Sequence, residues 1–161
     1  MIISETNQLA CLDLIDEKAS EQLAAQLALC LSPSLVVALS GEIGAGKTTI
    51  IRAMLRKLGV ESAIKSPTFS LVESYYCNNL QIHHFDLYRI HHEDELEYLG
   101  FRDYFTNQSI CFIEWAEHAG NALPQVDIRF NLSINGAGRE MQMSASSVAG
   151  KRILACLAGE S

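Results

Sequence analysis

Apolar positions along the chain recur with two periods, which predict helices and strands in turn. Leucines recur every fourth residue within 16–31, and this spacing predicts an amphipathic helix that ends at Ser32-Pro33. The continuous apolar run at 35–39 is typical of a short strand buried on both faces. A second apolar stripe, at 50–58, predicts another helix, for which Gly59 is a natural stop.

The rest of the chain predicts a mixture of further strands and short helices. The predicted strands are 69–76 and 80–85, joined at Asn78-Asn79, the buried run 109–113, and 126–134 with 140–144, paired around Asn135-Gly136. The predicted helices are 91–99, a short one at 102–105, and a closing one at 148–157. Together these elements predict one α/β domain over residues 1–161, with a central, mostly parallel sheet, antiparallel additions and flanking helices. The residues before Asp16 carry no distinctive pattern.

A glycine-rich segment joins the strand at 35–39 to the helix that follows it. Its sequence, Gly41-Glu42-Ile43-Gly44-Ala45-Gly46-Lys47-Thr48, fits the phosphate-loop pattern G-x-x-x-x-G-K-[ST]. Glycines allow backbone torsions that turn successive amide N–H groups toward phosphate oxygens, and the helix adds the positive end of its dipole. Lys47 would span the β- and γ-phosphates, Thr48 would bind Mg²⁺, and Thr49 would donate to the α-phosphate.

The alternative for this segment is a glycine-rich turn that carries an ordinary surface lysine. The buried strand before it and the helix after it favour the phosphate loop, because the mechanism requires that context. No N-K-x-D stretch is present to read guanine, and no L-S-G-G-Q signature marks a transporter ATPase. We therefore expect residues 42–49 to bind ATP together with Mg²⁺.

Two acidic residues follow apolar strands. Glu114 ends the run 109–113, as in a Walker-B strand, and would reach Mg²⁺ directly or through water. On its own this strand would favour a solvated glutamate at a strand end, but the phosphate loop changes that interpretation. Asp86 ends the strand 80–85 in the same way and is the second candidate acid. Lys47, Asp86 and Glu114 are therefore the predicted catalytic residues.

The histidines and cysteines predict no metal centre and no disulfide. His83 and His84 are adjacent, so in a strand they point to opposite faces and cannot easily share one ion. His91, His92 and His118 are interpreted as surface or helix-cap residues. The five cysteines are odd in number and scattered, with no C-x-x-C pair, which favours reduced thiols in a cytoplasmic protein.

Charge and hydropathy restrict the partners. A net charge of −7 argues against an open basic groove for nucleic acid, so contact with RNA is expected to run through a partner. No run reaches the roughly 18–20 apolar residues that span a membrane, and the N-terminus lacks the pattern of a secretion signal. We expect a cytoplasmic protein that does not contact a membrane.

Four segments, in order, carry a family resemblance: the phosphate loop through Thr49, then S-P-T-F-S-L-V from Ser66, H-F-D-L-Y-R from His84, and I-E-W ending at Trp115. The chain resembles the bacterial TsaE (YjeE) family, small ATPases required for threonylcarbamoyl-adenosine modification of tRNA. Many families share a phosphate loop, but the other three segments together are specific. The resemblance runs from about Leu23 to Pro124, and later residues carry no signature.

The resemblance implies an ATPase that works with two partners, TsaB and TsaD, and does not catalyse the transfer itself. It implies that Lys47 is the phosphate-loop lysine, that Thr48 and Glu114 hold Mg²⁺, and that Asp86 orients or deprotonates the attacking water. Thr68 is either a switch residue that senses the γ-phosphate or part of a turn into a strand. Trp115 has three open roles: packing near the nucleotide, docking a partner, or an ordinary place in the core.

Two other functions use the same loop. A small-molecule kinase would transfer phosphate to a metabolite hydroxyl, with Asp86 accepting the proton. A nucleotide-gated binding module would not need both Asp86 and Glu114, which argues against it. Arg89 is a candidate to contribute a charge in cis, although a salt bridge within the fold is favoured.

Overall fold

The computed structural model describes residues 2–4, 8–42 and 44–159. Ile43, one of the predicted phosphate-binding residues, lies outside them. The strands are β1 (Ile2–Ile3), β2 (Leu9–Leu14), β3 (Leu35–Gly41), β4 (Val72–Cys77), β5 (Leu80–Asp86), β6 (Ser109–Glu114), β7 (Ile128–Asn135) and β8 (Gly138–Ala145). The helices are α1 (Glu17–Cys30), α2 (Lys47–Leu58), α3 (Asp94–Tyr98) and α4 (Val148–Leu157), with the 3₁₀ segments η1 (Phe101–Tyr104) and η2 (Ala116–Ala122).

All eight strands form one mixed sheet in the order β1-β2-β8-β7-β3-β6-β5-β4. The central neighbours β7, β3, β6 and β5 run parallel to one another. The four other pairings, β1 with β2, β2 with β8, β7 with β8 and β4 with β5, are antiparallel. The sheet therefore has the parallel centre and the antiparallel additions that the sequence predicts.

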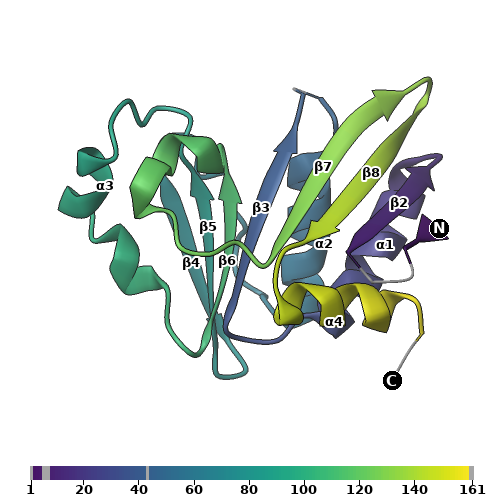
Figure 1. Ribbon diagram of the computed structural model, residues 1–161, viewed down its shortest axis with the longest axis horizontal. Coiled ribbons are helices and arrows are strands. Elements are labelled where there is room, and N and C mark those ends of the chain that lie inside the picture. The colour runs from purple at the N-terminus through teal and green to yellow at the C-terminus, as the bar shows by residue number, and fades with distance from the viewer. Residues whose placement is uncertain (1, 5–7, 43, 160–161) are drawn as a thin grey trace.

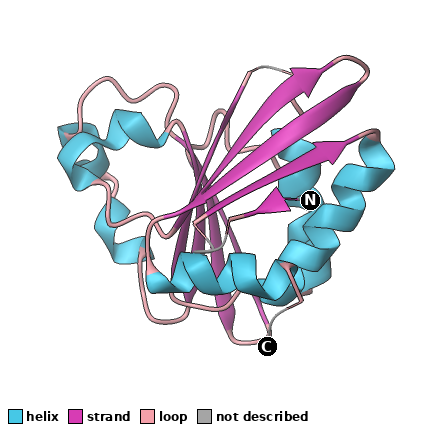
Figure 2. Cartoon of the chain, turned by 45° about the vertical axis from the view of Figure 1, so that its right-hand side comes forward, coloured by secondary structure: helices cyan, strands magenta, loops and turns pink. Residues whose placement is uncertain are grey.

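Helices cover both faces of this sheet (Figures 1 and 2). One core lies under α1, α2 and α4, and it takes alternate strand residues such as Val37, Ile110 and Phe112. The other core lies under α3, η1 and η2, and it takes the intervening residues, such as Val36 and Cys111. This alternation is why the central strands are apolar without interruption.

Local signals account for the helices that the sequence predicted well. Asp16 caps α1, because its Oδ1 accepts a hydrogen bond from the Ala19 amide at 2.8 Å. Gly59 ends α2 in the left-handed conformation, with φ of 114°. The helix predicted at 148–157 has those bounds in α4, where Ser147 is the cap.

Several boundaries and elements differ from prediction. The strand expected from residue 69 begins at Val72, because Leu71 has φ of 72° and its amide closes a turn onto Pro67. The helix expected over 91–99 is shorter, at 94–98. Strand β2 was not predicted at all; it is an outer strand whose pairing with β8, more than a hundred residues later, leaves no local signal.

The prediction of five reduced cysteines is wrong, because Cys30 and Cys156 form a disulfide with Cα atoms 5.7 Å apart. It joins the last residue of α1 to α4, and these helices pack on each other. Sequence spacing could not reveal this proximity, since the two residues are 126 positions apart. Burial raises the pKa of the free thiol of Cys111 to about 12, which keeps it protonated. Among the helices of the described residues, none has the length and apolar character to span a bilayer.

Candidate functional site

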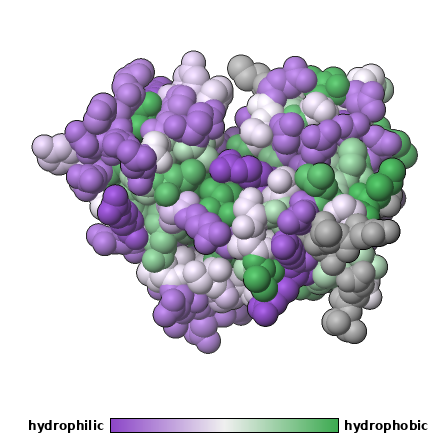
Figure 3. Space-filling model, in the orientation of Figure 1, coloured by the Kyte–Doolittle hydropathy of each residue, from purple (hydrophilic) through white to green (hydrophobic). Residues whose placement is uncertain are grey.

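The predicted site residues meet at the carboxyl ends of the parallel strands. In the register of the sheet, Glu114 of β6 lies opposite Leu39 of β3 on one side and Asp86 of β5 on the other. The phosphate-loop segment leaves the end of β3 at the same edge (Figure 1). In the space-filling view the surface is notched here, between the part formed by α3 and its neighbours and the part that carries the β7–β8 hairpin (Figure 3). The fold thus brings together side chains that are up to about 70 positions apart, from Lys47 to Glu114.

The glycine-rich segment has the backbone of an anion cradle. Gly44 and Gly46 have φ of 85° and 96°, and a Cβ added at either would meet no atom within 4 Å. The 12-residue helix α2 begins directly after Gly46 with no side-chain cap. Its first amides and its dipole therefore face the loop, and this combination suits a phosphate. Thr48, which follows at the start of the helix, is exposed.

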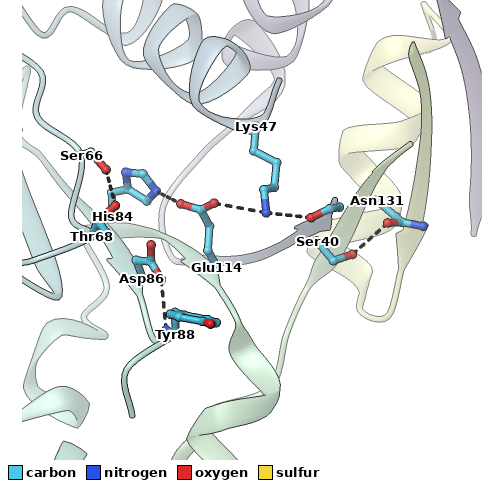
Figure 4. A network of polar contacts seen from close by, with 10 residues as sticks. Ser40, Lys47, Ser66, Thr68, His84, Asp86, Tyr88, Glu114 and Asn131 are labelled. Atoms are coloured by element: carbon cyan, nitrogen blue, oxygen red, sulfur yellow. Dashed lines mark hydrogen bonds and ion pairs between the residues drawn. The ribbon is translucent and has the colours of Figure 1, made fainter. Parts of the chain in front are cut away.

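Lys47, Glu114 and His84 form a network beside this loop (Figure 4). The Lys47 ammonium lies 3.7 Å from Glu114 Oε1 and donates to the Gly41 carbonyl at 2.9 Å. The second carboxylate oxygen, Oε2, lies 2.9 Å from Nε2 of His84. Because an ionised carboxylate only accepts hydrogen bonds, Nε2 carries the proton in this contact. Both His84 and Glu114 are buried, at 3% and 9% exposure.

The electrostatics of this network favour an ionised Glu114. Burial raises the pKa of the carboxyl, but the hydrogen bond and charge of His84, with the charge of Lys47, outweigh it and leave the pKa below its ordinary value. The site therefore presents a carboxylate next to an ammonium. A carboxylate in this position has the charge needed to hold a divalent cation directly or through water.

Asp86 and Thr68 lie in segments that border the network. Asp86 is half-buried, and its Oδ1 accepts a hydrogen bond from the Tyr88 amide at 3.0 Å. Thr68 is exposed, and its hydroxyl is 2.7 Å from that of Ser66. The predicted turn at Thr68 is present, since the Leu71 amide bonds the Pro67 carbonyl, and the strand begins later. A role for Thr68 in sensing phosphate stays a prediction.

Trp115 is a surface residue and not the core tryptophan that was one of the alternatives. It is 37% exposed and has φ of 59°. Its ring packs against Tyr88, with centroids 5.0 Å apart, and against His118 at 5.4 Å. With Gly41 and Lys47 it lines a small cavity of about 50 Å³. This position leaves packing near a nucleotide and docking a partner as the two roles for Trp115.

Arg89 contacts a ring instead of an acid. Its guanidinium carbon lies 4.5 Å from the centroid of Phe69, which is 81% exposed. This is a cation–π contact, so the predicted salt bridge with another described residue is not what holds Arg89. Within residues 2–4, 8–42 and 44–159, Arg89 takes part in no ion pair.

The two adjacent histidines of β5 point to opposite faces of the sheet, as alternation in a strand requires, and His118 lies in η2. His83 points to the face opposite His84, contacts Tyr104, and bonds the Ser74 hydroxyl at 2.7 Å. His118 Nδ1 lies 2.8 Å from the Leu87 carbonyl. Across the described part of the chain no cluster of three metal-ligating side chains occurs.

Sequence reasoning missed two sets of contacts at the site. His84 was considered only beside His83, although alternation places it on the same face of β5 as Asp86. The β7–β8 hairpin was assigned no role, yet Arg139 donates to the Gly44 carbonyl at 2.9 Å and Glu42 accepts from the Ile134 amide at 3.3 Å. No local signal reveals these hairpin contacts, because they depend on which strand lies next to β3.

Comparison with known proteins identifies the family. Residues 14–142 match the family model described as "Threonylcarbamoyl adenosine biosynthesis protein TsaE". The tRNA threonylcarbamoyladenosine biosynthesis protein TsaE of Haemophilus influenzae is 43% identical over 128 residues, which cover 80% of this chain and 81% of that protein. The TsaE protein of Bacillus subtilis is 33% identical over 138 residues, covering 86% and 85%. The crystal structure of Bacillus subtilis YdiB superposes with a TM-score of 0.78 at 25% identity, covering 94% of this chain and 95% of that one. This chain therefore belongs to the TsaE family of threonylcarbamoyl adenosine biosynthesis proteins.

Proposed function

We propose that this protein binds and hydrolyses ATP with Mg²⁺, and that its turnover supports threonylcarbamoyl-adenosine modification of tRNA. The observation that carries the proposal is the juxtaposition of Lys47 and Glu114, 3.7 Å apart, at the mouth of a glycine loop that opens a helix. A lysine, a carboxylate and free helix amides at one strand edge are the parts that a P-loop NTPase requires.

The loop fits a phosphate because of its shape and its charge. The glycines leave open space at Gly44 and Gly46, and the amides of Gly44 and of residues 46–49 would supply the donors. In the structure Lys47 contacts the Gly41 carbonyl and Glu114. Phosphate oxygens would replace these partners, since the lysine side chain is flexible and its ammonium has three donors.

The metal fits the same site. Thr48 and Glu114 would hold Mg²⁺, one through a hydroxyl and the other through a carboxylate, directly or through water. When bound, Mg²⁺ would neutralise charge that develops on the phosphates. His84 would keep the Glu114 carboxylate oriented, as an outer partner of a metal ligand commonly does.

Asp86 is proposed to orient or deprotonate the attacking water. Asp86 of β5 pairs with Glu114 of β6 in the sheet, and its Oδ1 accepts a hydrogen bond from the Tyr88 amide. This bond fixes the side chain so that the second oxygen is the one available to a water. Placing the acid at the end of a rigid strand suits a group that must be held within about 0.5 Å of a productive geometry.

The family context supports the cellular part of the proposal. The protein would act with TsaB and TsaD, would not itself transfer the threonylcarbamoyl group, and would reach tRNA only through these partners. Its net charge of −7 agrees with that division, because phosphate-rich RNA is repelled by an acidic surface. We propose that a partner contacts the exposed pair Trp115 and Tyr88, which lies next to the proposed nucleotide site. The proposed location of the protein is the cytoplasm.

Binding and hydrolysis of Mg²⁺-ATP by single variants test the site. Lys47→Ala should abolish binding, while Glu114→Ala and Asp86→Ala should bind nucleotide and lose most hydrolysis. Normal hydrolysis by both acid variants would refute the site assignment. Transfer of the γ-phosphate to a metabolite, with little release of free phosphate, would instead indicate a kinase.

A further inference from the structure

The β7–β8 hairpin touches the phosphate loop at three successive points. At the base of the loop, Gly41 pairs with Leu132, and a Cβ on Gly41 would come within 2.5 Å of the Leu132 carbonyl oxygen. Along its flank, the Glu42 carboxylate accepts from the Ile134 amide at 3.3 Å. Toward its tip, Arg139 reaches the Gly44 carbonyl.

Arg139 makes the last of these contacts, and its guanidinium donates two hydrogen bonds there. It is the second residue of β8, half-buried, and shares a strand face with Met141, which lies in the core under α1 and α2. Its Nη2 donates to the Gly44 carbonyl at 2.9 Å and its Nη1 donates to the Gly138 carbonyl at 2.8 Å. The guanidinium therefore joins the hairpin to the loop with one planar group.

Holding the Gly44 carbonyl also sets the direction of an amide. In a trans peptide the C=O and the next N–H point in opposite directions. The carbonyl turned toward Arg139 thus turns the Ala45 N–H the other way, where it donates to the backbone carbonyl of Glu42 at 3.1 Å. Gly44 itself, with φ of 85° and no neighbour within 4 Å of its Cβ position, has no side-chain packing to hold this peptide.

We propose that Arg139 is a positioning residue that holds the phosphate loop in the conformation that receives phosphate. The inference rests on the proposed nucleotide binding. Arg139 lines one cavity of about 210 Å³ together with loop residues Gly44 and Gly46, and the acidic residues Asp16 and Glu17 line its other side, so Arg139 contributes through its hydrogen bond to the loop. Losing a hydrogen bond from a charged donor corresponds to about a 10-fold loss of affinity or more.

The test compares the binding of Mg²⁺-ATP and of inorganic tripolyphosphate by isothermal titration. Arg139→Ala should weaken both by a similar factor, about 10-fold. Arg139→Lys should recover only part of the loss, because an ammonium cannot bond both carbonyls in a planar fork. Arg129→Ala is the matched control and should bind like wild type, since Arg129 is exposed on the opposite face of β7 from the core residues under α1 and α2.

Each outcome decides the inference. A loss for ATP with unchanged tripolyphosphate affinity would overturn it, because Arg139 would then contact the nucleoside directly. Unchanged binding by both Arg139 variants would overturn it as well, whereas a wild-type protein that bound neither ligand would refute the proposed function and the inference with it. If Arg139→Ala did not fold, Arg139→Lys, whose charge is intact, would decide by the same comparison.

Discussion

Replacing His84 by alanine tests whether the buried network at the site stabilises the fold. The substitution removes the 2.9 Å partner of Glu114 and leaves that carboxylate, 9% exposed, with Lys47 at 3.7 Å. A hydrogen bond to a charged group contributes about 1.5–3 kcal/mol, and the uncompensated burial of a charge costs more. We expect the free energy of unfolding to fall by about 2–4 kcal/mol.

Thermal unfolding followed by circular dichroism measures this loss. For a chain of this size, each 1 kcal/mol shifts the melting temperature by about 2–4 °C, so His84→Ala should melt about 4–16 °C lower than wild type. His92→Ala is the control: the His92 side chain is 67% exposed, and its loss should change stability by less than about 0.5 kcal/mol.

A double-mutant cycle with Glu114→Ala assigns the loss to the contact itself. In the Glu114→Ala background no buried carboxylate is left to lose its partner, so His84→Ala should cost about 1.5–3 kcal/mol less than it does in wild type. An equal cost in both backgrounds would show that the contact between His84 and Glu114 does not cause the loss. A His84→Ala protein as stable as the His92→Ala control would contradict the expected loss itself.

The disulfide, a buried histidine and a loop glycine can each be tested by one substitution and thermal unfolding. Cys30→Ser removes a cross-link between residues 126 apart and should cost about 2–5 kcal/mol, a difference that vanishes in reductant; a wild type indifferent to reductant would contradict it. Burial lowers the pKa of His83 below its ordinary value of 6.5. As the pH falls, the unfolded chain therefore binds a proton at a higher pH than the folded protein does. The stability that His83 contributes is present above pH 6.5 and is lost as the pH falls toward the lowered pKa; His83→Gln should flatten this slope, and His92→Gln should not. Gly41→Ala, whose Cβ would meet a backbone oxygen at 2.5 Å, should destabilise more than Gly136→Ala, which has open space, and equal losses would argue against a close approach at Gly41.

The parts of the fold predicted correctly are those with local causes. Helix α1 follows from leucine spacing and the Asp16 cap, and α2 from the loop before it and Gly59 after it. The central parallel strands follow from short, uninterrupted apolar runs. In each case the residues that specify the element lie within it or beside it.

The features that were missed depend on contacts between distant segments. Strand β2 and the Cys30 disulfide require partners more than a hundred residues away, and Arg139 reaches the loop only because β7 lies beside β3. The role of His84 is different, because a signal for it existed. Alternation along β5 turns His84 away from His83 and places it on the same face as Asp86, which lies two residues later. That face meets Glu114 at the end of the neighbouring strand β6.

We propose that this protein is an ATPase whose turnover is coupled to TsaB and TsaD. Phosphate release from Mg²⁺-ATP by the purified protein, alone and with both partners, tests it most directly. We expect turnover well below about 1 s⁻¹ for the protein alone, a clear change when TsaB and TsaD are added, and no turnover with Lys47→Ala. Turnover that is indifferent to both partners, or that survives Lys47→Ala, would contradict it.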